Sequence, residues 1–451
     1  MKPIYLSEVI SGVQGKCRND DADILINNIS TDSRKVKKGD LFIALQGENF
    51  DGHDFIPIAV KKGAAVVIAH KPVMGELPVP VIMVSDTGQA LLDLARSYRQ
   101  KLQKPVIAVT GSVGKTSTKN MIAAALSFKW QVHKTEANFN NNIGLPLTIL
   151  QWEEEHDLMV VEMGMRGFGE ISALTHAAQP SIAVITNIGI SHLERLGSQE
   201  NILKAKLEIV EGMEKNGVLM LNANDPLLSK STPNYSGKII YVGREVEADY
   251  TAYDIINDGE YGVSFKIELK GQEYCFNIPA VGEHNVANAL FGIACGIELG
   301  LSPIEIMRGL ESFRPEKLRC DIIERSGIKF INDSYNASPD SMKAALDILA
   351  HLAQGKRSIA VLGNIFELGE MAGPAHFQVG EMCRDLGVDF TAIIGENAFD
   401  LARGIGDSKK YKIFDNHEEI VKYLKSYLKQ GDVVLIKGSR GMRMERILEL
   451  W

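Results

Sequence analysis

The stretch that decides the fold is VIAVTGSVGKTST, at residues 106–118. It opens with an apolar run, as expected of a buried strand, and continues into a turn that contains two glycines. Lys115 and Thr116 then begin a stretch with a helical pattern that runs to residue 128. A strand, a glycine-rich turn and a helix in this order are typical of a loop that binds nucleotide phosphates.

The residue types of this loop fit that chemistry. A polyphosphate needs backbone N–H groups free of bulky side chains, a helix N-terminus, a lysine and a hydroxyl group that can bind magnesium. These parts come from Gly111, Ser112, Val113, Gly114, Lys115, Thr116 and Ser117. The common G-x-x-x-x-G-K-[ST] spacing would require glycine where Val109 stands, so the loop is a T-G-x-x-G-K-[ST] variant. This variant points away from small GTPases and common kinases, and the alternative is a turn that only joins strand to helix.

Length and charge limit the remaining possibilities. At 451 residues the chain is about three times a ~150-residue domain, so we expect several domains. Hydrophobic residues make up 45% and charged residues 24%, as in ordinary globular proteins. The net charge of -8 gives no overall attraction to nucleic acid or anionic lipid, so we expect no nucleic-acid partner.

Cysteine use and hydropathy point to the cytoplasm. The five cysteines are dispersed without C-x-x-C spacing, which suggests neither a zinc site nor a disulfide framework. Glu8 interrupts the first apolar run, so the N-terminus does not read as a secretory signal. No run reaches the ~18 apolar residues of a spanning helix, and we expect no membrane insertion.

The pattern along the chain predicts an α/β protein of three domains. Residues 1–100 read as a small α/β unit, residues 101–312 as a phosphate-loop domain with a mainly parallel sheet, and residues 313–451 as a Rossmann-like domain. A proline after a helix within residues 310–319 predicts the hinge before the third domain. Strands are predicted at 105–110, 158–162, 182–186, 218–221, 239–242, 329–332, 358–362, 391–394 and 433–436, and helices at 89–102, 115–128, 169–178 and 200–213.

Three polar residues follow buried strands of the central domain. Glu162 ends the strand LMVVE, His192 lies in a turn after the strand IAVIT, and Lys206 lies on the helix beyond that turn. The carboxyl edge of a parallel sheet is where ligands bind, so each residue is a candidate for the site. Taken alone, each also has an ordinary explanation: a solvated strand end, a structural histidine and an exposed lysine.

Several segments together resemble the Mur ligase family. They are TGSVGKTST at 110–118, NFNNNIGLPLTIL at 138–150, VVEMGMRGFGEI at 160–171, ITNIGISHLERLGS at 185–198, NANDP at 222–226, GEHNVANAL at 282–290, PEKLRCDII at 315–323 and NDSYNASPDSM at 332–342. Within the family, STDSRKVKKGDLFIALQGENFDGHDF at 30–55, MGMRGFGEI, SYNASPDSM and KGSRGMRMERI at 437–447 are most similar to the members that add D-alanyl-D-alanine.

The resemblance implies an ATP-dependent amide ligase of peptidoglycan synthesis. It would add D-alanyl-D-alanine to a UDP-N-acetylmuramoyl-tripeptide through an acyl phosphate, giving the pentapeptide precursor. The first domain would bind the UDP-sugar, the second ATP, and the third both ATP and the dipeptide. We expect a cytoplasmic monomer, although the sequence decides neither the oligomeric state nor whether the third residue of the peptide is lysine or diaminopimelate.

The resemblance also implies roles for individual residues at the ATP site. Lys115 would contact the phosphates, Thr116 and Glu162 would bind one Mg²⁺, and His192 with a carbamylated Lys206 would bind a second. Adenine would meet Asn285 and Asn288, whose spacing places both amides on one helix face. The third domain would add Arg319 to the phosphates and Asp333 to the ribose.

The other substrates would be bound by further residues that the resemblance implies. The UDP group would meet Ser33, Arg34, Gln46 and Gly47, and the sugar, its phosphates and the peptide would meet Thr135, Asn138, Asn141 and Arg166. The dipeptide would meet Asn336, Ser338, Asp340, Lys437 and Arg440. Without the resemblance, the asparagines read equally as turn or cap residues and Arg34 as a solvated side chain.

Two rival functions remain open at this point. One is another ligase of the same kind, which would add a single amino acid or extend folate polyglutamate, although folate ligases lack a first domain like residues 1–100. The other is an ATP-dependent switch that binds a nucleotide sugar without ligation. Such a switch would have no need of Lys206 at a second metal site.

Overall fold

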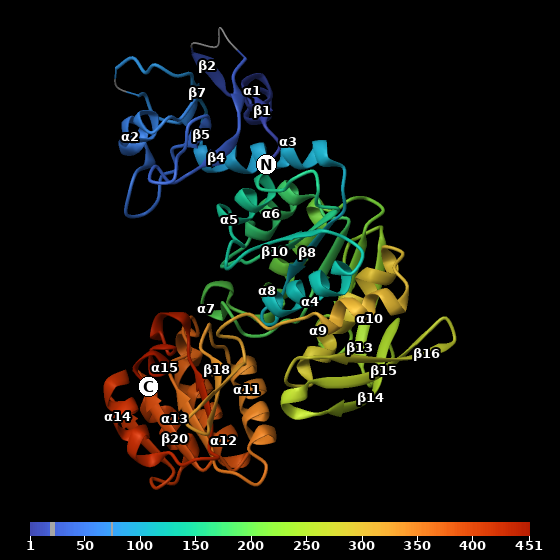
Figure 1. Ribbon diagram of the computed structural model, residues 1–451, viewed down its shortest axis with the longest axis vertical. Coiled ribbons are helices and arrows are strands. Elements are labelled where there is room, and N and C mark those ends of the chain that lie inside the picture. The colour runs from blue at the N-terminus through green and yellow to red at the C-terminus, as the bar shows by residue number, and fades with distance from the viewer. Residues whose placement is uncertain (19–22, 74) are drawn as a thin grey trace.

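The computed structural model describes residues 1–18, 23–73 and 75–451. Three main β-sheets follow one another along the described chain, and helices pack on each of them (Figure 1). The N-terminal part lies at one end of the molecule, the phosphate-loop part in the middle, and the C-terminal part beside an antiparallel extension of the central sheet (Figure 1). The predicted α/β class is confirmed.

The N-terminal part holds a five-stranded sheet in the order β2-β7-β6-β5-β4 and a separate β1-β3 pair. Strands β4 to β7 are parallel, and β2 joins them in the antiparallel direction. The strands are β1 (Ile4–Tyr5), β2 (Lys16–Arg18), β3 (Leu25–Ile26), β4 (Asn28–Ser30), β5 (Asp40–Ile43), β6 (Val66–Ala69) and β7 (Val81–Met83). The helices are α1 (Leu6–Val13), the 3₁₀ turn η1 (Gly52–Phe55), α2 (Ile56–Lys61) and α3 (Thr87–Leu102).

The central sheet has nine strands in the order β16-β15-β14-β13-β12-β11-β8-β10-β9. The pairs from β9 to β14 are parallel, whereas β15 and β16 continue the sheet in the antiparallel direction. The strands are β8 (Val106–Thr110), β9 (Val132–Lys134), β10 (Leu158–Glu162), β11 (Ile182–Ile185), β12 (Val218–Asn222), β13 (Lys238–Arg244), β14 (Tyr250–Asn257), β15 (Val263–Leu269) and β16 (Gln272–Ile278).

Helices and 3₁₀ turns lie between the strands of this part and after the last of them. They are α4 (Lys115–Ser127), α5 (Gly144–Leu150), α6 (Glu170–Ala178), α7 (Leu193–Leu196), α8 (Gln199–Leu207), η2 (Glu208–Gly212), η3 (Gly259–Tyr261), α9 (His284–Glu298) and α10 (Pro303–Glu311). The helix predicted at 200–213 is therefore an α-helix that ends at Leu207 and continues as a 3₁₀ turn.

The C-terminal sheet has six strands in the order β17-β18-β22-β19-β20-β21, and every pair except β17-β18 is parallel. The strands are β17 (Asp321–Arg325), β18 (Ile328–Asp333), β19 (Ser358–Leu362), β20 (Phe390–Ile394), β21 (Tyr411–Phe414) and β22 (Val433–Lys437). The helices are α11 (Pro339–Leu352), η4 (Gly369–Met371), α12 (Ala372–Asp385), α13 (Ala398–Ile405), α14 (His417–Tyr427), η5 (Arg440–Met442) and α15 (Arg446–Leu450). This is the doubly wound arrangement expected of a Rossmann-like sheet.

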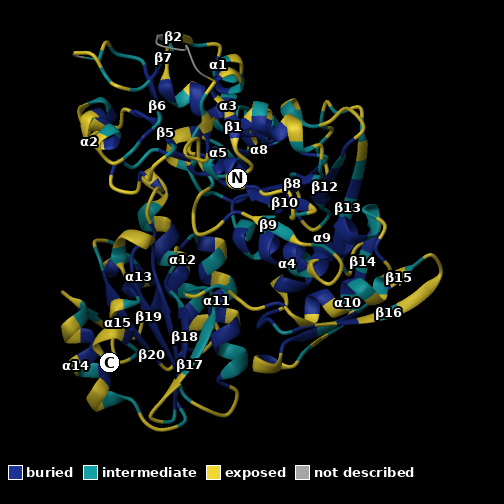
Figure 2. Cartoon of the chain, turned by 45° about the horizontal axis from the view of Figure 1, so that its top comes forward, coloured by how far each residue is buried: buried dark blue, intermediate teal, exposed yellow. Residues whose placement is uncertain are grey.

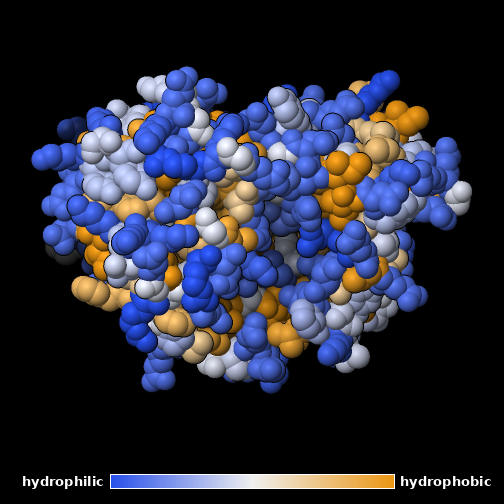
Figure 3. Space-filling view, turned by 90° about the horizontal axis from the view of Figure 1, so that it is seen from below, coloured by the Kyte–Doolittle hydropathy of each residue, from blue (hydrophilic) through white to orange (hydrophobic). Residues whose placement is uncertain are grey.

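Burial explains why some strands were easier to predict than others. Every residue of β8, β10 and β11 is buried, so these strands read as continuous apolar runs. Figure 2 shows strands such as β8 and β10 in dark blue, whereas the β15 and β16 end of the central sheet carries exposed residues in yellow. On the face seen in Figure 3, hydrophobic side chains lie in separate groups among hydrophilic ones. Among the described residues, no helix is both long and apolar enough to cross a membrane.

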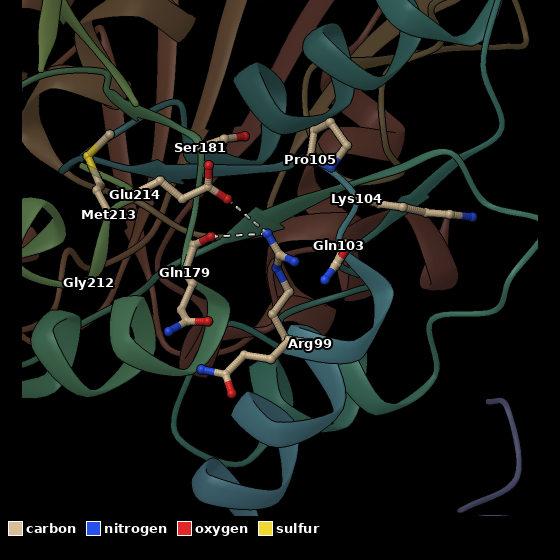
Figure 4. A pocket seen from close by; sticks show the side chains of 10 residues that line it. Arg99, Gln103, Lys104, Pro105, Gln179, Ser181, Gly212, Met213 and Glu214 are labelled. Carbon is tan, nitrogen blue, oxygen red and sulfur yellow. Dashed lines mark hydrogen bonds and ion pairs between the residues drawn. The ribbon is translucent and has the colours of Figure 1, made fainter. Parts of the chain in front are cut away.

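Helix α3 joins the N-terminal part to the central part through Arg99. Although this arginine is only 4% exposed, its guanidinium donates to Ala178 O at 3.0 Å and Gln179 O at 3.3 Å, and pairs with Glu214 at 3.4 Å. Figure 4 shows Arg99, Gln179 and Glu214 among the side chains that line a cavity, whose volume is about 470 Å³. Pro105 and Ser181 also line it and directly precede β8 and β11, so the joint lies at the opposite sheet edge from the phosphate loop.

The third part is joined to the second by a single chain segment between α10 and β17. Within this segment, Glu316 accepts a hydrogen bond from Asn120 Nδ2 at 2.9 Å and lies 3.5 Å from the buried Nζ of Lys119. Both partners belong to α4, directly after the phosphate loop. The predicted hinge region is therefore anchored to the helix that begins at the nucleotide site.

The Arg99 joint can be tested by Arg99→Met, which keeps much of the volume and removes the hydrogen bonds. Leaving the Ala178 and Gln179 carbonyls without this donor should cost about 1–3 kcal/mol of local stability. Amide hydrogen exchange in α3 should then speed up by on the order of 10-fold. Gln100→Met, on an exposed neighbour of the same helix, should leave the exchange unchanged. Equal exchange in both variants would show that Arg99 does not hold the joint.

Candidate functional site

The phosphate loop is shaped by a close approach to the end of β11. Gly111 has φ +149°, and a Cβ placed there would lie 1.9 Å from Thr186 Oγ1. Thr186 Oγ1 donates to Val113 O at 2.6 Å, and Val113 N donates to Asn187 Oδ1 at 2.9 Å. With Gly114 at φ +84° before α4, the loop backbone is held open at a helix N-terminus. Thr186 and Asn187 were not predicted, although both directly follow a buried strand.

Lys115 and Thr116 lie where the loop enters α4. Lys115 Nζ donates to Gly111 O at 2.9 Å, and Thr116 Oγ1 donates to Glu162 Oε2 at 2.8 Å. Burial lowers the pKa of Lys115, while the nearby Glu162 carboxylate opposes that effect. The lysine, the hydroxyl and the carboxylate, which the sequence analysis named as candidate site residues, therefore lie close together.

Glu162 is fixed in place by two residues of the loop that follows β9. It is 3% exposed at the carboxyl end of β10, and its Oε1 accepts from Asn140 Nδ2 at 2.8 Å. Its backbone N–H donates to Thr135 Oγ1 at 3.0 Å. Thr135, predicted as a substrate contact, is fully buried here and orients the strand end. Asn140 was missed, because the three consecutive asparagines gave no sign of which one faces the carboxylate.

Lys206 is the most unusual ionisable group of the site. It lies near the end of α8, is 1% exposed, and no described residue accepts a hydrogen bond from its Nζ. Burial, together with repulsion from Lys115, lowers the pKa of Lys206 well below its ordinary value. Burial of this kind favours the neutral amine of a lysine over its ammonium form. The structure thus places it beside the phosphate-loop lysine.

His192 lies at the start of α7, next to α8. Its backbone is left-handed, with φ +66°, and its Nδ1 lies 2.7 Å from Glu367 Oε2 of the C-terminal part. This hydrogen bond, with attraction to Arg166 and Arg195, lowers the pKa of the Glu367 carboxyl. Glu367 was not predicted, because no local pattern marks a single glutamate in a loop of another domain.

Arg319 reaches into the site from the start of the third part. Its Nη2 donates to Thr116 Oγ1 at 2.9 Å, and its guanidinium lies 4.2 Å from the ring centre of Tyr335. Its Nε is buried and has no hydrogen-bond partner. The predicted phosphate-contacting arginine is therefore already at the phosphate loop, with one donor unused.

Asn285 and Asn288 lie on one face of α9, as the spacing predicted. Asn288 Nδ2 donates to Asn285 Oδ1 at 2.9 Å, and Thr118 Oγ1 donates to Asn288 Oδ1 at 2.8 Å. Asn285 Nδ2 donates to Val281 O at 2.9 Å. The pair lies beside Gly114, since a Cβ there would be 3.4 Å from Asn288 Oδ1.

The predicted dipeptide contacts divide into two kinds. Ser338 caps α11 by accepting from Ser341 N at 3.3 Å, and the buried Lys437 Nζ pairs with Asp333 and donates to Asn336 O at 3.0 Å. The side chains of Ser338, Lys437 and Asp333 therefore already have hydrogen-bond partners within the fold. Asp333 is the predicted ribose contact.

The side chains of the remaining two candidates, Asp340 and Arg440, have fewer partners among the described residues. Asp340 makes no hydrogen bond with any described residue, and its Oδ2 lies 2.4 Å from where a Cβ at Gly189 would stand. Burial and the nearby Asp225 raise the pKa of Asp340. Arg440 pairs with Glu445 at 2.7 Å at the molecular surface. Asp340 thus brings a carboxylate of the third part against the central part.

Of the candidates for the UDP-sugar and peptide, Thr135 contacts Glu162, whereas the others make contacts of their own. Arg34 is exposed and pairs with Asp32 at 2.9 Å, Ser33 is buried, and Gln46 and Gly47 lie in the loop that precedes η1. Asn141 Oδ1 accepts from Gly144 N at 2.8 Å and so begins α5, while Asn138 and Arg166 are exposed. Within the described part of the chain, no hydrogen bond or ion pair joins the N-terminal candidates to the phosphate loop.

The site offers Mg²⁺ the oxygen atoms of a hydroxyl and a carboxylate. This ion prefers oxygen ligands and usually takes one or two protein carboxylates together with substrate phosphates. Among the described residues, no group of three or more His, Cys, Asp and Glu side chains forms a metal cluster. The adjacent Thr116 hydroxyl and buried Glu162 carboxylate nevertheless fit an ion that is shared with a bound triphosphate.

Comparisons with known protein families identify three consecutive regions. The family model "Mur ligase family, catalytic domain" matches residues 25–99, "Mur ligase middle domain" matches 109–296, and "Mur ligase, glutamate ligase domain" matches 318–440. The chain is also 40% identical to the UDP-N-acetylmuramoyl-tripeptide--D-alanyl-D-alanine ligase of Bacillus subtilis, over 94% of this chain and 93% of that protein.

Solved structures agree over the whole chain. A crystal structure of MurF from Acinetobacter baumannii is 32% identical, with a TM-score of 0.93 over 100% of this chain and 99% of that one. MurF from Thermotoga maritima in complex with ADP is 30% identical, with a TM-score of 0.85 over 94% of this chain and 96% of that one.

The buried pair of Lys437 and Asp333 predicts a stability effect. Lys437→Met should leave Asp333 as an uncompensated, largely buried carboxylate, since their side chains are 2% and 14% exposed. We expect a loss of about 3–5 kcal/mol in the third part, visible as a lower unfolding transition in calorimetry. Lys409→Met, on an exposed lysine of the same part, should leave the transition in place. An unchanged transition in Lys437→Met would mean that this pair does not support the fold.

Proposed function

The chain belongs to the Mur ligase family, and from this membership we propose that it joins D-alanyl-D-alanine to a UDP-N-acetylmuramoyl-tripeptide with the consumption of ATP. The observation that carries the proposal is the cluster that Lys115, Thr116, Glu162 and Lys206 form at the phosphate loop. Such a cluster suits the activation of a carboxylate by ATP, because two anions must be brought together there.

The proposed reaction has two steps. An oxygen of the peptide's terminal carboxylate bonds to the γ-phosphorus of ATP, the bond to the β-phosphate oxygen breaks, and ADP leaves. The dipeptide amine then attacks the acyl carbon, a tetrahedral intermediate forms, phosphate leaves, and the nitrogen loses its extra proton. Phosphorylation is needed because a carboxylate is a poor electrophile with no good leaving group.

The phosphates are proposed to bind residues Gly111 to Ser117. The loop N–H groups would hold the β-phosphate, and Lys115 would exchange its hydrogen bond with Gly111 O for one with the phosphates. Arg319 would add its unused Nε–H, which is buried at the same place. Together these groups would offset the repulsion between ATP and the incoming carboxylate.

Two Mg²⁺ ions are proposed to assist, by neutralising charge on the phosphates and the reacting carboxylate. Thr116 and Glu162 would hold one, and His192 with Lys206 the other. An ammonium cannot bind a cation, so Lys206 would first add CO₂: its neutral amine forms an N–C bond and loses a proton, leaving an anionic carbamate. The buried position without a hydrogen-bond acceptor supports this modification.

The other contacts are proposed by domain. Asn285 and Asn288 would bind adenine with the amide hydrogens that their own contacts leave free, and Asp333 would accept from the ribose. The UDP group would lie against residues 1–100, at Ser33, Arg34, Gln46 and Gly47. The sugar and peptide would follow through residues 101–312, at Thr135, Asn138, Asn141 and Arg166.

Residues 313–451 are proposed to bring the dipeptide to the acyl phosphate. Of the candidates there, Asp340 is the best acceptor for its ammonium group, because no described residue donates a hydrogen bond to that carboxylate. Asn336 and Arg440 would face the dipeptide's carbonyl and carboxylate, whereas Ser338 and Lys437 would keep the pocket in shape. We further propose that the protein acts as a monomer in the cytoplasm.

The substrate assignment is tested by phosphate release from ATP in the presence of a UDP-N-acetylmuramoyl-tripeptide. Release should require D-alanyl-D-alanine and should fall to background with D-glutamate, L-alanine or a diamino acid in its place. Equal turnover with a diamino acid would assign a different member of the family. ADP formation that is independent of the UDP-linked peptide would favour an ATP-driven switch.

The carbamate is tested by Lys206→Met, with Lys204→Met on the exposed side of the same helix as control. Labelled bicarbonate should give a carbamate carbon signal in the unaltered protein and in the control, and none in Lys206→Met. Ligation should fall by on the order of 100-fold or more without the carbamate.

The same experiment predicts a pH dependence. Because burial lowers the pKa of Lys206, its amine stays neutral at pH values where an exposed lysine is charged. The signal should therefore persist to a lower pH than the carbamate of an exposed lysine would, and it should disappear as the pH falls through the lowered pKa of Lys206. Undiminished ligation in Lys206→Met would refute this role.

A further inference from the structure

A loop of the third part, residues 363–371, is fixed firmly between β19 and α12. Ile365 N donates to the buried His376 Nε2 at 3.0 Å, and Phe366 N donates to Ser439 Oγ at 2.9 Å. Ser439 N in turn donates to Asn364 O at 2.9 Å. Ile365 and Leu368 are both 3% exposed, so these two side chains anchor the loop in the core. The intervening Glu367 is thereby presented outward from a rigid support.

The loop presses closely against α7 of the central part. Glu367 itself has φ +63°, an uncommon conformation for a residue with a side chain. A Cβ at Gly369, where φ is +54°, would lie 3.2 Å from Glu194 Cγ. Two left-handed residues within three positions therefore bend the loop toward the turn that carries His192. Strained backbone of this kind often marks a functional position.

Cationic or imidazole side chains of the central part act on the Glu367 carboxylate. His192 Nδ1 lies 2.7 Å away, and Arg166 and Arg195 attract it. On the same loop, Glu370 is exposed and has no ion pair with any described residue. The carboxylate thus has one close partner, and this partner is a ring nitrogen that comes from another domain.

We propose that Glu367 is a positioning residue that holds His192 with its proton on Nδ1, so that Nε2 presents its lone pair to the second metal ion. A histidine ring that donates one N–H to a carboxylate is fixed in tautomer and orientation, and its other nitrogen becomes a better ligand. The inference rests on the proposed function, because it assigns the partner of a ligand in that metal site.

Glu367 and His192 belong to different domains, which links the docking of these domains to the second metal site. The carboxylate belongs to the domain that would bring the dipeptide, whereas His192 and Lys206 belong to the domain that binds ATP. The second metal site is therefore complete only when the third part is docked against α7. Docking of the amine-bearing domain and readiness for carboxylate activation are coupled through one hydrogen bond.

Metal binding by the full chain provides the first test, with Mn²⁺ as the probe and a non-hydrolysable ATP analogue present. The bound Mn²⁺ that depends on His192 is identified as the one that His192→Ala removes. Glu367→Ala should weaken this ion by about 10- to 100-fold, and Glu367→Gln should weaken it less, because an amide oxygen still accepts the Nδ1–H bond. Glu370→Ala, which removes a charge from the same loop, should bind Mn²⁺ as the unaltered protein does.

The second readout is the histidine tautomer, followed by ¹⁵N NMR of labelled histidine without metal. The His192 signal, assigned by its loss in His192→Gln, should report a proton on Nδ1 in the unaltered protein and shift toward the Nε2–H form in Glu367→Ala. A merely structural effect of the loop would not move this signal.

Equal Mn²⁺ affinity and an unchanged tautomer in Glu367→Ala would overturn the proposal. A weakening of the same size in Glu370→Ala would also overturn it, because loop charge alone would then be responsible. These results are separate from the substrate assay, since the unaltered protein can fail to use D-alanyl-D-alanine and still bind Mn²⁺ through His192.

Discussion

The geometry of the site depends on how closely the phosphate loop approaches the end of β11. The missing side chain of Gly111 leaves room for Thr186, whose hydroxyl holds Val113 O while Asn187 holds Val113 N. This contact sets where α4 begins, and the start of α4 in turn sets Thr116 against Glu162. A methyl group at Gly111 would overlap the threonine and displace each of these groups at once.

The three parts contribute to one site through different kinds of joint. Helix α3 is tied to the central part by a buried arginine and by helix packing, which fixes the N-terminal part at the far edge of the sheet. The third part contacts the central part through polar pairs, among them those of Arg319, Glu316 and Glu367. Apolar packing adds to these pairs, because Val281 and Ile190 of the central part pack against the core of the third part.

Much of the fold could be predicted from the sequence, because parallel strands buried on both faces read as unbroken apolar runs. Strands β14 to β16 were missed since their exposed faces carry polar residues and the apolar signal is diluted. In the site, the phosphate loop and Glu162 followed from local spacing, whereas the pairing of His192 with Glu367 joins residues 175 positions apart. Lys437 and Ser338 could not be separated from true substrate contacts, because the same residue types also hold a fold together.

The chain passes from the second part to the third through one segment, between α10 and β17, and this has a thermodynamic consequence. Because the third part is covalently tethered by a short segment, its docking onto α7 is intramolecular and occurs at an effective concentration on the order of millimolar. A contact as small as one hydrogen bond between His192 and Glu367, which could not hold two separate proteins together, can then bias docking measurably. The tether thus allows the two domains to meet often and part easily, as repeated cycles of substrate entry and product release require.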